Sequence, residues 1–296
     1  MEIGIGKEIR KRAEMPCSLQ VLLCTIGAEG IARLVASRHP RVEGVGYLVA
    51  WQLPDGDCDV PQMLLERDDF EIVVTHTRGI SRNRNIAIES SSAPLLLMGD
   101  DDVDYSAEGL RTLAAMLEAH PDTDVAACRY TCCGQYVKPY PEDVCPERKA
   151  PRGWYITAYE LAFRRESVTR RVRFNEKISL GTEVIRCGEE EVFLTDARRA
   201  GLSVSLFPVT IGAHDRDGTG ERCYREPWWI MAHGAIMRHK FPFSWIPRVF
   251  VHALRAAHKG HTPFFSYMRH ALAGGRYASR TRIFEPETIS SDNERD

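Results

Sequence analysis

The chain has 296 residues, of which 44% are hydrophobic and 27% are charged, and its formal net charge is −2. These values are typical of a globular protein and allow one large domain with an appendage or two modest domains. A net charge so close to zero argues against a polyelectrolyte partner, and we expect no nucleic-acid binding.

The first 15 residues are charged and contain no apolar core, so no signal peptide is predicted. No stretch reaches the roughly 18 apolar residues that would span a bilayer. The nine cysteines are irregularly spaced and include no C-x-x-C pair, which favours reduced thiols over a zinc site or a disulfide framework. The sequence therefore predicts a cytoplasmic protein.

Short apolar runs alternate with helical patterns after a polar lead-in at residues 1–17. Buried strands are predicted at 19–24, 45–51, 70–74 and 95–98. Helices are predicted at 30–38, at 82–89 with Ser81 as its cap, and from 106 onward. Strands and helices that alternate at this spacing favour βαβ units. We therefore predict an α/β fold with a Rossmann-like, mostly parallel sheet flanked by helices.

The second half of the chain contains a well-marked helix and a long aromatic segment. The helix follows residue 191, has Arg198 and Arg199 in its last turn, and ends at Gly201. A strand is predicted at 202–209. The predicted organisation is a main domain at 18–225, a helical appendage at 226–285, and a polar tail at 286–296 that we expect to be disordered.

Asp100, Asp101 and Asp102 directly follow the apolar run at 95–98. In open α/β sheets, ligands bind beyond the carboxyl ends of such strands. Two unit charges about 4 Å apart repel by about 4 kcal/mol at an effective dielectric near 20, so a divalent cation would stabilise this group. Oxygen ligands suit Mg²⁺ or Mn²⁺, and we expect Asp102 and then Asp100 to bind the metal. Asp101 is expected to accept hydrogen bonds from a sugar or ribose hydroxyl; a turn with solvated acids is the alternative.

A second acidic cluster, Glu189–Glu191, stands at the N-terminus of the later helix, where the helix dipole alone favours acids. At about 100° per residue, Glu190 falls on the apolar stripe of Phe193, whereas Glu191 points away from it. A glutamate on that inner side is suited to act as a general base. Glu190 is therefore our catalytic candidate, and Glu189 is less central but not excluded.

Two further side chains are candidates for ligand contacts. His214 follows the last predicted strand and would face the aspartates from the other half of the sheet, where it could bind a metal; a packed or surface histidine is the alternative. Arg84 follows the turn at 79–81, whose helix N-terminus suits an anion or the edge of a nucleotide. Simple solvation at the surface is the alternative for Arg84.

Residues 227–285 carry nine lysines and arginines and very few acids, interleaved with aromatic side chains. This composition fits a helical cap packed on the main domain. The alternative is an amphipathic surface that rests on an anionic membrane.

Taken in chain order, these motifs resemble family 2 glycosyltransferases of the GT-A fold. The resemblance covers roughly residues 18–220 and depends on the segments at 79–87, 97–102, 174–176, 188–194 and 198–201, together with His214. The chain departs from the family pattern in three places: Cys24-Thr25-Ile26-Gly27 replaces Pro-Thr-Tyr-Asn, Trp51-Gln52 replaces acidic residues, and Glu190 replaces the commoner aspartate.

The resemblance implies inverting transfer of a sugar from a nucleotide-diphosphate donor to an acceptor hydroxyl. Asp102, assisted by Asp100, would hold Mn²⁺ or Mg²⁺ on the diphosphate, and His214 would complete the metal site. Glu190 would deprotonate the acceptor.

The same resemblance implies that Thr25 and Arg84 line the nucleotide pocket. The acceptor would be a glycan or glycolipid in polysaccharide or cell-envelope synthesis. Such an acceptor would place the protein in the cytoplasm or at the inner face of the cell membrane, where residues 227–285 would make peripheral contact with anionic lipid.

Two other classes of protein stay open. A metal-dependent nucleotidyltransferase also places aspartates at a strand end, but residues 25–29 lack the basic residue of its usual phosphate loop. A non-catalytic module that binds a sugar nucleotide or a membrane is the second alternative. The presence of two intact acidic clusters argues against it.

Overall fold

The computed structural model describes residues 7–13, 16–214 and 224–285. The chain divides into two compact units. The first comprises Met1–Gly181 and Glu189–Glu221, and the second comprises Thr182–Gly188 and Arg222–Asp296. The segment at 182–188 thus groups with the C-terminal helices, whereas the sequence placed it within the main domain.

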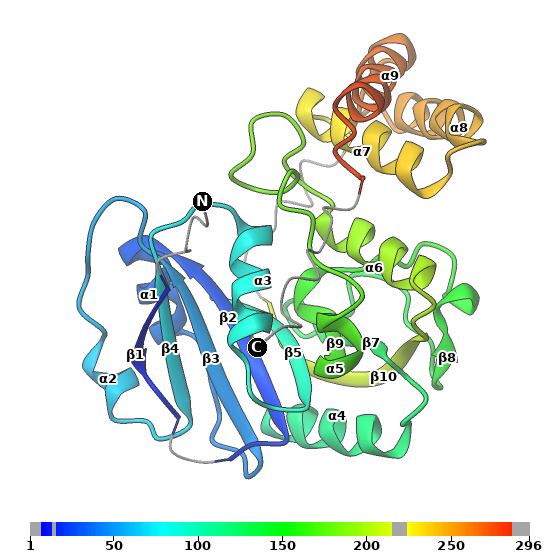
Figure 1. Cartoon of the computed structure of the whole chain (residues 1–296). Helices are drawn as coiled ribbons and strands as arrows, with labels where there is room; N and C mark the ends of the chain where they lie inside the picture. Colours follow the sequence, from blue (N-terminus) through cyan, green and yellow to red (C-terminus); the bar gives the residue numbers. More distant parts are fainter. Residues whose placement is uncertain (1–6, 14–15, 215–223, 286–296) are drawn as a thin grey trace, which may run out of the picture. The chain divides into compact units, whose positions relative to one another are not determined.

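A mixed sheet forms the centre of the first unit (Figure 1). Ten strands are present among the described residues, in the order β1-β4-β3-β2-β5-β9-β7-β10-β6, with β8 beside β10. The strands are β1 (Lys7–Lys11), β2 (Leu19–Ile26), β3 (Val45–Gln52), β4 (Phe70–Thr75), β5 (Leu95–Asp100), β6 (Asp104–Tyr105), β7 (Val125–Thr131), β8 (Cys145–Pro146), β9 (Leu161–Arg164) and β10 (Val204–Ala213).

The neighbouring strands β4, β3, β2 and β5 run parallel, which confirms the predicted α/β core. All eight residues of β3 are buried, as expected for a strand covered on both faces. Two features differ from the prediction. The short strand β9 runs antiparallel between β5 and β7, and the polar lead-in contributes β1, which pairs antiparallel with the edge of β4.

Helices cover both faces of the sheet. Leu19, Val21 and Leu23 of β2 point into the core beneath α1, α2 and α4, whereas Leu22 and Cys24 point toward α3, α5 and α6. This alternation follows from the two-residue repeat of a strand. The helices are α1 (Gly27–Ala36), α2 (Gln62–Leu65), α3 (Ile80–Ser90), α4 (Ala107–Ala119), α5 (Arg165–Thr169) and α6 (Glu189–Arg199).

The start of α3 differs from the prediction. Ser81 is not the N-cap; Gly79 is, with a φ of 107°, and Gly79 can adopt this value because it lacks a Cβ. Ser81 is buried inside the helix, and its hydroxyl donates to the main-chain oxygen of Ile178 at 3.0 Å. By contrast, Ser106 caps α4 as its sequence indicates and accepts the N–H of Gly109 at 3.2 Å.

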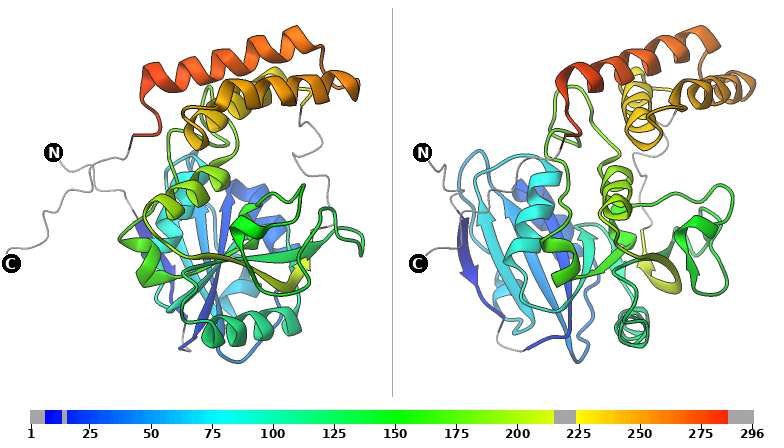
Figure 2. Two further views of the ribbon diagram at one scale, coloured as in Figure 1. Left: turned by 90° about the vertical axis from the view of Figure 1, so that its right-hand side faces the viewer. Right: turned by 45° about the vertical axis from the view of Figure 1, so that its right-hand side comes forward.

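The second unit contains α7 (Pro227–Lys240), α8 (Trp245–His258) and α9 (Phe264–Thr281), which are seen in both views of Figure 2. These helices share a core that includes Trp245, Val249 and Tyr267. Helices α7 and α9 approach so closely that only glycine fits at their contact. A Cβ at Gly234 or Gly274 would overlap a main-chain carbonyl oxygen of the other helix. The predicted disordered tail at 286–296 lies outside the described residues. None of the described helices combines the length and the hydrophobicity that a transmembrane span requires.

Candidate active site

The aspartate cluster lies at the carboxyl ends of two parallel strands. Asp100 ends β5 and lies opposite Cys24 of β2 in the register of the sheet. Asp101 is buried. Its carboxylate accepts the Thr25 hydroxyl at 2.6 Å and two N–H groups of Arg33 at 3.1 and 3.0 Å. Asp101 therefore fastens the loop after β5 to β2 and α1, and its predicted contact with a sugar or ribose hydroxyl stays a prediction.

Arg84 of α3 joins the two acidic clusters. Its Nη1 donates to Glu189 Oε1 at 2.7 Å, and its Nη2 lies 3.5 Å from Asp100 Oδ1. The guanidinium also packs over the ring of Phe174, 5.4 Å from its centroid. Only 5% of the side chain is exposed. Burial acts to lower the pKa of Arg84, but Glu189 and Asp100 outweigh it and leave the pKa raised, so the buried group stays charged.

Glu189, the less central candidate of its cluster by sequence, is also a site residue. It is buried and is the closest acidic partner of Arg84. The sequence did contain a signal for it: Glu189 stands four residues before Phe193, and residues four apart share one face of a helix. Burial also raises the pKa of Asp100, an effect that Arg84 opposes.

Glu190 lies beside this ion pair without joining it. Its Oε2 is shielded from solvent and has no hydrogen-bond partner within the described residues. Burial, and then the neighbouring charge of Glu189, raise the pKa of Glu190 to about 8. Perturbed carboxyl groups of this kind gather at functional sites, because a base works best when its pKa is close to the working pH.

His214 and Asp102 form a second pair at the same edge of the sheet. His214 directly follows β10, and its Nε2 lies 3.3 Å from Asp102 Oδ2. The imidazole stacks on Tyr159, with ring centroids 5.3 Å apart and an angle of 11° between the planes. The hydrogen bond with Asp102 raises the pKa of His214.

This pair presents an imidazole nitrogen and a carboxylate oxygen, which are donor types that divalent metals accept. Adjacent ligands of an octahedral Mg²⁺ lie about 3 Å apart, because each is about 2.0–2.1 Å from the ion. The atoms of Asp102 and His214 are 3.3 Å apart, a distance that their direct hydrogen bond accounts for equally well. Asp100, the other predicted ligand, faces Arg84 instead, and no three histidine, cysteine or acidic side chains in the described ranges gather around one point.

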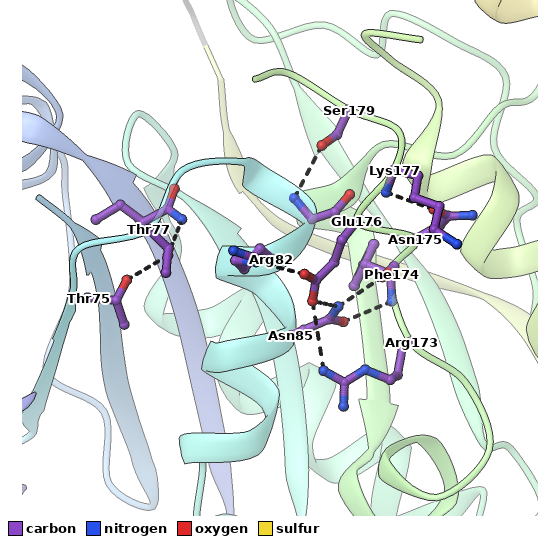
Figure 3. Close-up of polar contacts among 12 residues, drawn as sticks. Thr75, Thr77, Arg82, Asn85, Arg173, Phe174, Asn175, Glu176, Lys177 and Ser179 are labelled. Carbon is purple, nitrogen blue, oxygen red and sulfur yellow. Dashed lines mark hydrogen bonds and ion pairs between the residues drawn. The ribbon is translucent and has the colours of Figure 1, made fainter. Parts of the chain in front are cut away.

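The 174–176 motif is held against α3 by a network of polar contacts (Figure 3). The side-chain amide of Asn85 donates to the main-chain oxygen of Phe174 at 2.9 Å and accepts its N–H at 2.9 Å. Glu176 accepts from Asn85 at 3.0 Å and from Arg82 at 2.8 Å. These contacts fix Phe174 beneath the guanidinium of Arg84.

Solved structures share this fold at low sequence identity. The S. aureus TarS fragment 1–349 is 15% identical, with a TM-score of 0.55, over 90% of this chain and 92% of that one. The same fragment in complex with UDP-GlcNAc has a TM-score of 0.56 at 15% identity and the same coverage. The longer S. aureus TarS structure is 14% identical, with a TM-score of 0.57, over 86% of this chain and 55% of that one. No protein-family model matches the sequence, and no curated protein matches it.

The TarS structures are glycosyltransferases of the GT-A fold. The predicted resemblance is therefore confirmed at the level of the fold: this chain has a GT-A fold with a helical C-terminal unit.

The raised pKa of Glu190 predicts a specific dependence of stability on pH. The unfolded chain releases this proton near pH 4.5, whereas the folded chain holds it until about pH 8. The contribution of Glu190 to the free energy of unfolding is therefore fully present below pH 4.5 and is lost as the pH rises toward about 8. Glu190→Gln should remove this loss, so the unfolding free energy of the variant relative to wild type should increase across that window and level off above it. Urea denaturation at several pH values measures the difference; a constant difference would show that Glu190 titrates normally.

Proposed function

We propose that this protein is a glycosyltransferase that moves a sugar from a nucleotide-diphosphate donor to an acceptor hydroxyl with inversion. The observation that carries the proposal is the contact of one buried arginine, Arg84, with both Asp100 and Glu189. This contact brings the end of β5 and the start of α6 to one place. The TarS fragment of the same fold was solved with UDP-GlcNAc and with UDP, which supports a nucleotide diphosphate as the donor class.

We assign the diphosphate side of the site to Asp102 and His214, which would hold Mn²⁺ or Mg²⁺ together with phosphate oxygens of the donor. When bound, the metal would neutralise the charge that develops on the leaving diphosphate. Thr25, at the end of β2, is proposed to line the nucleotide pocket. Arg84 is proposed to line it too, while its charge holds the two acidic clusters together.

We assign the acceptor side to Glu190. The acceptor oxygen forms a bond to the anomeric carbon while the bond from that carbon to the diphosphate oxygen breaks, and the acceptor proton passes to the Glu190 carboxylate. A base on the face opposite the leaving group produces inversion. Burial raises the pKa of Glu190 to about 8. The ionised carboxylate that accepts the proton should therefore predominate only in mildly alkaline solution.

The acceptor is proposed to be a glycan or glycolipid, in polysaccharide or cell-envelope synthesis. A metal-dependent nucleotidyltransferase is the runner-up, and a non-catalytic sugar-nucleotide module is the third class. Transfer or slow hydrolysis of a sugar nucleotide, with release of the nucleoside diphosphate, would distinguish the first class from both others. A nucleotidyltransferase would release pyrophosphate, and a binding module would release nothing.

Glu190→Gln should lower sugar transfer by about 10²–10⁴-fold, because a general base contributes a factor of this size. Donor affinity should stay nearly unchanged, since Glu190 is assigned to the acceptor. Nucleoside diphosphate release measures transfer, and calorimetry measures donor binding. Glu191→Gln, on the same turn of α6, is the matched control and should keep near-normal transfer. A Glu190→Gln variant whose transfer stays within a few-fold of wild type would remove Glu190 from this role.

Asp102→Asn should abolish the Mn²⁺-dependent part of the affinity for a nucleoside diphosphate, because an amide is a poorer ligand than a carboxylate for a hard cation. Calorimetric titration of UDP with and without Mn²⁺ checks this. Asp104→Asn is the matched control, two residues along the chain at an exposed position, and it should bind like wild type. An Asp102→Asn variant with unchanged Mn²⁺-dependent affinity would contradict the metal assignment.

A further inference from the structure

Helix α8 has an exposed apolar face on the side away from its own core. We define the α8 face as Ile246, Phe250, Val251 and Leu254, which are 49%, 47%, 43% and 49% exposed. At about 100° per residue these four side chains span an arc of roughly 140°. The core of the second unit does not use them, because α8 packs on it through the different stripe of Trp245, Val249 and Ala253.

The α8 face continues onto the start of α9. The ring of Phe250 lies 5.2 Å from that of Phe264, which in turn lies 5.3 Å from that of Phe265. Phe265 is 83% exposed, and Phe243, just before α8, is fully exposed. Six of the 14 large hydrophobic side chains that are exposed in the described ranges therefore fall between residues 243 and 265. Exposed apolar side chains gathered this densely mark an interaction surface.

The segment that contains the α8 face is strongly positive. Residues 227–285 contain nine lysines and arginines against one acidic residue, Glu285, which gives a formal net charge of +8. Arg255 and Arg248 follow the α8 face on the side of Val251, within roughly 60° of it around the helix. Both are exposed, as is Lys259 directly after α8. Cationic side chains thus border an apolar strip along one helix.

We propose that the α8 face docks on an anionic lipid surface, with Phe250 and Leu254 in the acyl boundary and the bordering arginines among the headgroups. An apolar face with basic borders is the pattern of a helix that lies in the plane of a membrane interface. Anionic lipid also complements the charge of +8 on residues 227–285, whereas a second copy of this chain would bring two strongly positive segments together. The proposal does not depend on sugar transfer.

Flotation of the full chain with vesicles tests this docking. The vesicles are phosphatidylcholine alone or phosphatidylcholine with one third phosphatidylglycerol. Wild type should partition at least about tenfold better onto the anionic vesicles, and added salt should reduce that preference. The double variant Phe250→Asp/Leu254→Asp should lose roughly tenfold or more of the partitioning. Arg255→Glu/Lys259→Glu should lose the preference for anionic lipid.

Met63→Asp is the matched control, because Met63 is 54% exposed but lies on α2 of the first unit. It should float like wild type, and circular dichroism should show that all variants keep their helices. Unchanged flotation of the Phe250→Asp/Leu254→Asp variant, or equal flotation of wild type with neutral and anionic vesicles, would overturn the proposal. So would a concentration-dependent dimer that this double variant abolishes, since the α8 face would then belong to a second copy.

Discussion

The buried, positively charged side chain of Arg84 organises the site. Removing a charged group from water costs several kcal/mol unless partners compensate it, and the Arg84 side chain is only 5% exposed. Glu189 and Asp100 provide that compensation from two segments that are distant in the sequence. Because an unpaired Arg84 would be costly, the fold is constrained to keep the end of β5 beside the start of α6. The neighbouring Glu190 forms no ion pair within the described residues, and burial, together with the charge of Glu189, raises its pKa.

The elements that position the site are those with strong local signals. The apolar run before Asp100 predicts β5, the apolar stripe and Gly201 predict α6, and the alternation of strands with helices predicts the parallel core. Contacts between distant residues leave no such local signal. The Arg84–Glu189 pair joins residues 105 positions apart, and the Arg33–Asp101 pair joins residues 68 positions apart. In the sequence, the charged residues of these two buried pairs look the same as charged residues that are solvated at the surface.

Competition between local conformational preferences explains the smaller differences between the predicted and the observed elements. Ser81 has the side chain of a cap, but Gly79 takes the backbone conformation that begins α3, so the helix starts one residue before the serine. Residues 7–11 are polar, yet they form β1 because an edge strand needs only main-chain hydrogen bonds and one partner, β4. The roles of Thr25, Asp101, Asp102, Glu190 and His214 toward a ligand stay predictions, since they depend on a donor and an acceptor.

The central claim is that Arg84 couples the two acidic clusters, and a double-mutant cycle tests it most directly. The unfolding free energies of Arg84→Met, Glu189→Gln and the double variant would be measured by urea denaturation against wild type. We predict a coupling of about 2–3 kcal/mol, with the double variant less destabilised than the sum of the single variants, because each single change leaves a buried charge unpaired. Additive effects, within about 0.5 kcal/mol, would contradict the account.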